Sequence, residues 1–133
     1  MDGRQLISSG SPYELTVGYS RAVRVGDRVV VAGTAPQWPD GEVDPDPAAQ
    51  ARRCFEIIGQ ALEEAGASFG DVVRTRVYLV DAADFAPISA VHGEVFSAVR
   101  PANTTLVVAA LLDSQWKVEI EVEAVVATDS AAR

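Results

Sequence analysis

Three glutamates alternate with apolar residues in the segment 118–124, which reads Val-Glu-Ile-Glu-Val-Glu-Ala. Side chains alternate across a β-strand, so Glu119, Glu121 and Glu123 are predicted to share one face, with neighbouring positions about 7 Å apart. A glutamate that faces a ligand can orient a water molecule or shuttle a proton. A row of three is costly unless water, hydrogen-bond donors or a partner chain meets it.

A polar segment lies just upstream of this acidic row. Residues 100–105 read Arg-Pro-Ala-Asn-Thr-Thr and lead into a second apolar stretch, Leu106 to Ala110. A polar loop that feeds one strand beside an acidic strand is where we expect any chemistry to take place.

The elements that must position these residues can be read from the sequence pattern. Gly26-Asp27 predicts a tight turn between two β-rich runs. Asp46 and Pro47 predict a helix start, and Gly66 a helix end. The predicted strands are 5–8, 21–25, 28–32, 71–80, 104–110 and 116–127, and the predicted helices are 47–65 and about 84–99. The order β-β-β-α-β-α-β-β indicates an α+β domain, a mixed β-sheet with two helices on one face.

The apolar patterns predict how these elements are buried. Val29 to Ala32 is apolar throughout, so this strand is expected to be central and covered on both faces. In the strand 71–80, Val73 is expected to share one face with Thr75, Val77 and Leu79. The second sheet face and the carboxylate row together favour packing of several subunits through their sheets.

Composition restricts the classes of function. The 133 residues suit one domain, 1–133, and the net charge of −8 with scattered arginines argues against nucleic-acid binding. Cys54 and His92 are the only cysteine and histidine, so no intrachain disulfide or zinc site is expected; both are interpreted as structural. No signal peptide or membrane-spanning segment is predicted, and a soluble cytoplasmic protein is expected.

The layout and seven local strings resemble the Rid family, also called YjgF/YER057c/UK114. The strings, in order, are 18–20 (Gly-Tyr-Ser), 32–36 (Ala-Gly-Thr-Ala-Pro), 41–43 (Gly-Glu-Val), 49–52 (Ala-Gln-Ala-Arg), 70–75 (Gly-Asp-Val-Val-Arg-Thr), 84–86 (Asp-Phe-Ala) and 118–121 (Val-Glu-Ile-Glu). The resemblance implies a chorismate-mutase-like fold, a homotrimer with clefts between subunits, and a small-molecule ligand. In archetypal members it implies hydrolysis of 2-imino or enamino acids without a metal or organic cofactor.

The resemblance also implies site residues. Glu121 matches the strand glutamate that would orient water or shuttle a proton, with Glu123 as the alternative if the register slips by two. The implied substrate-binding positions are Tyr19, Ala32, Gly33, Ser89, Asn103 and Thr105.

Asn103 stands where the imine deaminases carry the arginine that grips the substrate carboxylate. An asparagine has no positive charge, so the chain resembles the arginine-lacking branches, and classical 2-imino acid deamination is not expected. Arg100, three positions earlier, is the alternative source of a cation.

Three functions follow as hypotheses. The first is hydrolysis of an imine, enamine or similarly activated C–N bond in a small metabolite, charged or uncharged. The second is a non-catalytic trimer that binds a small ligand or has a regulatory role. The third, endoribonuclease or translation-inhibitor activity, is weakened by the acidic charge and by the lack of a His/Lys catalytic pair.

Overall fold

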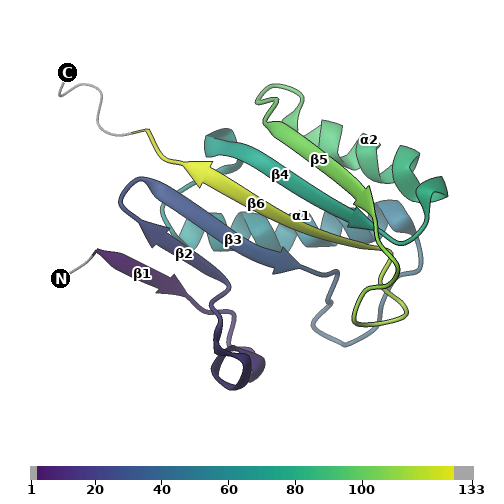
Figure 1. Cartoon of the computed structure of the whole chain (residues 1–133), viewed down its shortest axis with the longest axis horizontal. Helices are drawn as coiled ribbons and strands as arrows, with labels where there is room; N and C mark the ends of the chain where they lie inside the picture. Colours follow the sequence, from purple (N-terminus) through teal and green to yellow (C-terminus); the bar gives the residue numbers. More distant parts are fainter. Residues whose placement is uncertain (1–2, 128–133) are drawn as a thin grey trace.

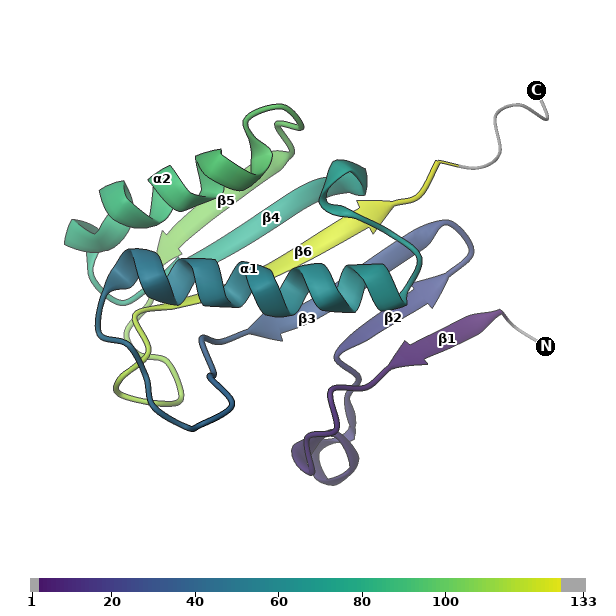
Figure 2. The ribbon, with the colours of Figure 1, turned by 180° about the vertical axis from the view of Figure 1, so that it is seen from behind.

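The computed structural model describes residues 3–127, and these form one six-stranded sheet with two long helices packed against one of its faces (Figures 1 and 2). The elements follow the predicted order. They are β1 (Arg4–Ile7), β2 (Ala22–Val25), β3 (Arg28–Thr34), α1 (Pro47–Glu64), β4 (Val72–Leu79), α2 (Phe85–Phe96), β5 (Ala102–Val107) and β6 (Val118–Val125). The predicted α+β class, a mixed sheet with two helices on one face, is confirmed.

The spatial order of the strands is β1-β2-β3-β6-β4-β5. Strands β4 and β5 run parallel, with α2 as the crossover between them, and every other neighbouring pair is antiparallel. The acidic strand β6 therefore lies in the middle of the sheet, between β3 and β4 (Figure 1).

Helix α1 forms where its local signals place it. The Asp46 carboxylate accepts a hydrogen bond from the backbone N–H of Ala49 at 3.0 Å, and Pro47 occupies the first turn. Gly66 follows the helix with φ of 81°, a conformation that suits glycine. One apolar stripe of the helix is buried in the core, and it comprises Ala51, Cys54, Phe55, Ile58, Leu62 and Ala65.

Among the strands, the last two differ most from the predicted boundaries. Strand β5 covers Ala102–Val107 rather than 104–110, and β6 covers Val118–Val125 rather than 116–127. The parallel pairing explains the first difference, because β5 pairs with β4 from Arg74↔Ala102 to Leu79↔Val107, where β4 ends. The apolar residues beyond Val107 therefore continue outside the strand.

Two predictions about the faces of strands were wrong. Val30 is 44% exposed, because the helices cover only the face of β3 that carries Val29 and Val31. In β4, Val72 is buried and Val73 is 47% exposed, because the pairing with β6 shifts register between Val72 and Arg74 and reverses the alternation there.

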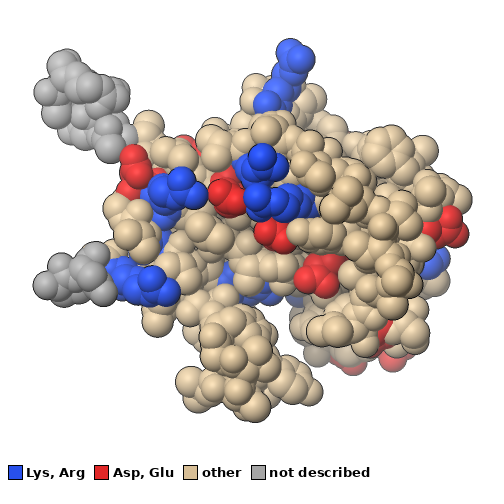
Figure 3. Space-filling model, in the orientation of Figure 1, with Lys and Arg blue, Asp and Glu red and all other residues tan. Residues whose placement is uncertain are grey.

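The face of the sheet opposite the helices, called here the bare face, carries the acidic row and its partners. Arg76 contacts Glu121 at 3.2 Å and Glu123 at 2.9 Å, and Arg28 contacts Glu123 at 3.3 Å. Figure 3 shows this intermixing of acidic and basic side chains over the middle of the sheet. The cost of three neighbouring carboxylates is thus reduced by arginines from the strands on either side.

Candidate functional site

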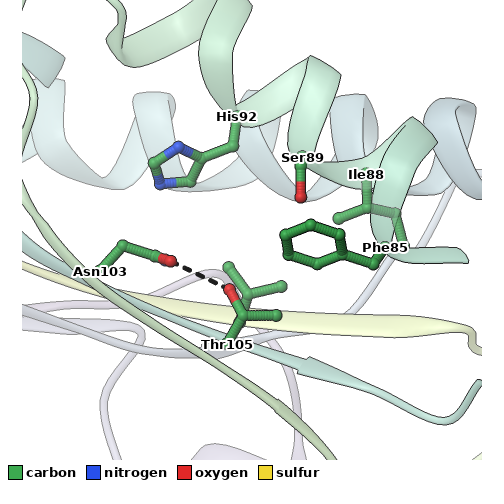
Figure 4. A pocket seen from close by; sticks show the side chains of 7 residues that line it. Phe85, Ile88, Ser89, His92, Asn103 and Thr105 are labelled. Carbon is green, nitrogen blue, oxygen red and sulfur yellow. Dashed lines mark hydrogen bonds between the residues drawn. The ribbon is translucent and has the colours of Figure 1, made fainter. Parts of the chain in front are cut away.

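A pocket of about 250 Å³ lies between α2 and the outer strands of the sheet, and it brings together three of the predicted site residues (Figure 4). Asn103 and Thr105 project from β5 toward α2, because they pair with Thr75 and Val77 on the helix-covered side of β4. Ser89 enters from α2. The full lining is Val77, Phe85, Ile88, Ser89, His92, Asn103 and Thr105.

Four polar side chains of this region form one hydrogen-bonded chain. Asn103 Nδ2 donates to Thr75 Oγ1 at 2.9 Å, and Thr105 Oγ1 donates to Asn103 Oδ1 at 3.0 Å. Thr75 Oγ1 also lies 2.9 Å from His92 Nε2. Since the Thr75 hydroxyl accepts from Asn103, its own proton is free for donation to Nε2 of a neutral His92. The chain fixes the orientation of the Asn103 amide.

His92 is held as a neutral ring at the inner side of the pocket. Its ring centroid lies 4.8 Å from that of Phe96, and burial lowers the pKa of His92. The structural role interpreted from the sequence agrees with these contacts, but the residue also lines the pocket. Its ring is therefore both a packing element and part of the ligand-accessible wall.

Phe85 is an apolar residue of α2 that lies at the pocket and not in the core. It continues the apolar stripe of α2, yet it is 52% exposed and lines the opening. Ile88, on the same stripe, is buried. An apolar residue at the first turn of a helix thus lies beside the cavity rather than in the core.

Three other predicted site residues, Tyr19, Ala32 and Gly33, lie elsewhere in the chain. The order β3-β6-β4-β5 puts two strands between β3 and β5, so Ala32 and Gly33 are roughly 14 Å from Asn103 at the usual strand spacing. In one chain these residues and the pocket do not form a single site.

An arginine that is not among the predicted site residues, Arg21, binds the backbone at Ala32 and Gly33. Arg21 Nη2 donates to the carbonyl oxygens of Ala32 at 2.6 Å and Gly33 at 2.7 Å. Its Nε is buried without a hydrogen-bond partner among the described residues, and burial lowers the pKa of Arg21. This guanidinium is a half-buried cation beside two predicted site positions.

Tyr19 is placed by the segment that precedes it. Its backbone N–H donates to the carbonyl of Glu14 at 2.9 Å, at the end of the helical turn Glu14–Gly18. The Glu14 carboxylate in turn accepts from Ser8 and from both the hydroxyl and the N–H of Ser9, and these bonds, led by the Ser9 hydroxyl, lower the pKa of Glu14. The phenol ring remains exposed.

Glu121, the predicted catalytic residue, lies on the bare face with its carboxylate occupied. Tyr78 donates to Glu121 Oε1 at 2.7 Å, and Arg76 lies 3.2 Å from Oε2. The hydrogen bond to Glu121 raises the pKa of Tyr78. Both oxygens of the carboxylate are therefore engaged within the chain.

Glu119, which the family resemblance does not select, has a carboxylate that is free of the contacts made by Glu121. Burial raises the pKa of Glu119, and neighbouring Glu121 adds to the shift while Arg21 opposes it. Among the described residues its carboxylate makes no hydrogen bond or salt bridge. Its Oε2 occupies the space that a β-carbon at Gly33 would need. In the sequence, only Gly33 could have indicated the position of Glu119, because a glycine has no side chain and leaves room for this carboxylate.

Burial raises the pKa of Cys54, which is fully enclosed, so this thiol is not available as a nucleophile.

Within residues 3–127 no group of three His, Cys, Asp or Glu side chains is arranged to hold a metal ion. In the same range no helix has the length and apolar character needed to cross a membrane.

Comparison with known proteins assigns the chain to a family. The model of the family described as Endoribonuclease L-PSP matches residues 11–126. A solved structure of Rv2704 from Mycobacterium tuberculosis, a member of the YjgF/YER057c/UK114 family, superposes with a TM-score of 0.86 at 44% identity, covering 92% of this chain and 99% of that one. The chain belongs to the YjgF/YER057c/UK114 family.

Two relatives illustrate the range within this family. A protein of Streptomyces coelicolor, SCO2049, is 42% identical over 121 residues, covering 89% of each chain. The 2-iminobutanoate/2-iminopropanoate deaminase of Escherichia coli is 37% identical over 111 residues, covering 80% of this chain and 86% of its own length. One relative of this chain is thus named for imine hydrolysis.

Proposed function

We propose that this protein hydrolyses an imine or enamine C–N bond of a small metabolite, in clefts between the subunits of a homotrimer. The observation that carries the proposal is the pocket in which Ser89, Asn103 and Thr105 converge, three positions that the family resemblance implies for substrate binding. The relative named as a 2-iminobutanoate/2-iminopropanoate deaminase supports the reaction class.

The reaction needs a proton donor and acceptor rather than a nucleophilic side chain. Water adds to the imine carbon and gives a carbinolamine; the C–N bond then breaks, releasing ammonia and a carbonyl compound. A carboxyl group that gives and takes a proton near neutral pH serves both steps, and a raised pKa favours this. No cofactor enters the scheme.

Two glutamates compete for this role. The family resemblance selects Glu121, whereas the geometry favours Glu119, which has a raised pKa and a carboxylate without protein partners. Glu119 lies beside Gly33, on the sheet face opposite the pocket. Glu119 is therefore proposed to complete the cleft from a neighbouring subunit, together with Tyr19, Ala32 and Gly33, because within one chain these residues lie across the sheet from the pocket.

The test measures ammonia release from imines generated in situ by an amine oxidase, with Glu119→Gln and Glu121→Gln variants compared with the unchanged protein. We expect Glu119→Gln to lower kcat by roughly 100-fold or more, the usual contribution of a general acid–base group. Glu121→Gln should retain most activity. The reverse ranking would restore Glu121 as the proton-transfer residue, and no acceleration by the unchanged protein would refute hydrolysis.

A second function, ligand binding without turnover, is favoured by one observation. The pocket carries Asn103 where the archetypal deaminases have an arginine, and its amide is tied to Thr75 and Thr105. Saturable binding with no ammonia release would establish this function. The proposal does not extend to RNA cleavage, since the net charge of −8 and a single histidine with a lowered pKa do not suit phosphodiester chemistry.

A further inference from the structure

The pocket beneath α2 has no charged wall. Among the described residues, those that line it include no Asp, Glu, Lys or Arg side chain. Its one titratable lining group, His92, has a pKa lowered by burial and is neutral at physiological pH. Arg100, the alternative cation considered from the sequence, does not line the pocket. A ligand that enters must find its partners among neutral groups.

The Asn103 amide is the central polar group of this wall, and its remaining hydrogen-bonding capacity is defined. An asparagine side chain has two N–H donors and two acceptor lone pairs. One N–H is used by Thr75 and one lone pair by Thr105. One N–H donor and one acceptor lone pair remain on the same planar group.

The other lining residues add one free hydroxyl and an apolar floor. Ser89 makes no side-chain hydrogen bond within the described part of the chain, and its hydroxyl points into the pocket (Figure 4). Phe85, Ile88 and Val77 supply the apolar surface. The pocket thus offers a small polar wall opposite a small apolar one.

We propose that this pocket selects an uncharged ligand, anchored through a carboxamide or a similar neutral pair of N–H and C=O groups, and discriminates against the corresponding carboxylate. A carboxamide donates to the free lone pair of Asn103 and accepts from its free N–H. A carboxylate has acceptors only, so one of its oxygens would face the Asn103 carbonyl oxygen without a proton between them. It would also lose hydration without meeting a cation.

This proposal rests on the proposed function, because it names the substrate class of the same pocket. That substrate is an imine whose anchoring group is neutral. It is tested by binding rather than by turnover, so the two can fail separately. The probes are isosteric pairs that are not hydrolysed as imines: isobutyramide with isobutyrate, and benzamide with benzoate. Titration calorimetry on the assembled protein at pH 7.5 includes any charge that a second subunit adds.

We expect each amide to bind at least tenfold more tightly than its carboxylate. Asn103→Leu, which keeps the size of the side chain and removes both hydrogen-bonding groups, should weaken amide binding at least tenfold. Asn103→Arg should reverse the preference toward carboxylates. The matched control is Thr104→Val, on the same strand but on its opposite face, and it should leave both affinities unchanged.

Several results would overturn the proposal. One is a preference of the unchanged protein for the carboxylates. If the Arg21→Gln variant then lost this preference, Arg21 would be identified as the cation that replaces the missing arginine. Binding of neither probe class would overturn it as well, and so would unchanged amide binding in a folded Asn103→Leu variant. Turnover of 2-iminopropanoate with a carboxylate preference would leave hydrolysis standing and refute the neutral anchor. Amide selectivity without any imine turnover would support the neutral anchor and refute hydrolysis.

Discussion

At the scale of single residues, the site depends on groups whose partners fix their protonation or orientation. Asn103 is held by two threonines, and His92 by Thr75 and by the ring of Phe96. Because these bonds join β4, β5 and α2, a change in the charge of His92 would disturb the wall of the pocket as well as the packing. The pH dependence of stability tests this coupling.

We predict that His92 makes the protein less stable as the pH falls below about 6.5, the usual histidine value. Burial lowers the pKa of His92 in the folded chain, so between that lowered value and about 6.5 the unfolded chain binds more protons. Stability is then lost toward acid pH, by at most about 1.4 kcal/mol per pH unit and less for a half-exposed ring. Denaturant unfolding of the unchanged protein and of His92→Gln, from pH 7.5 to 5.5, measures the slope. Equal slopes would contradict the prediction.

At the scale of elements, a buried glutamine connects α1 to two loops and to the start of β6. Gln50 is fully buried; its Nε2 donates to the carbonyl oxygens of Asp44 and Gln115 at 2.9 and 3.0 Å, and its Oε1 accepts from the N–H of Lys117 at 2.7 Å. One side chain thus satisfies three backbone groups from segments far apart in sequence. It sets where β6 begins and so where Glu119 lies.

We predict that Gln50→Ala lowers the free energy of unfolding by about 3 kcal/mol, since three backbone groups lose their partner in a buried place. Chemical denaturation at fixed protein concentration measures the change. Gln60→Ala, at an exposed position of the same helix, is the matched control and should change stability little. A comparable change of stability in both variants would contradict the prediction, because alanine is the better helix former at either position.

At the scale of the whole molecule, the bare face of the sheet is the feature that a single chain leaves unexplained. Val30 and Leu106 are exposed there beside the Arg76, Glu121 and Glu123 cluster. An apolar and charged sheet face with helices on the other side only suits association with other copies through this face. The family resemblance implies three subunits.

We predict that the protein sediments as a trimer and that Val30→Lys shifts it toward the monomer. Val30 is paired with Glu123, so the new ammonium group has a counter-charge within its own chain, whereas burial against another subunit would be costly. Analytical ultracentrifugation with circular dichroism separates dissociation from unfolding. Gln60→Lys adds the same charge on the helix side and should remain trimeric. A folded, fully trimeric Val30→Lys protein would place the interface elsewhere.

Local patterns were sufficient to determine the elements of this protein. Asp46, Pro47 and Gly66 delimit α1, and the alternation of Glu119 to Ala124 predicts the strand β6, because capping and side-chain period depend on neighbours in sequence. The family followed from short strings along the chain and is shown by comparison.

The tertiary structure decided which of the site residues meet. Asn103, Thr105 and Ser89 converge on one pocket with His92, while Ala32 and Gly33 lie two strands away beside Arg21. Strand order and the register shifts at Val31/Thr34 and Val72/Arg74 come from pairing between distant segments, which no local period reports. For the same reason three equivalent carboxylates in the sequence become distinct in the fold: Glu121 is bound by Arg76 and Tyr78, and Glu119 rests in the space left by Gly33.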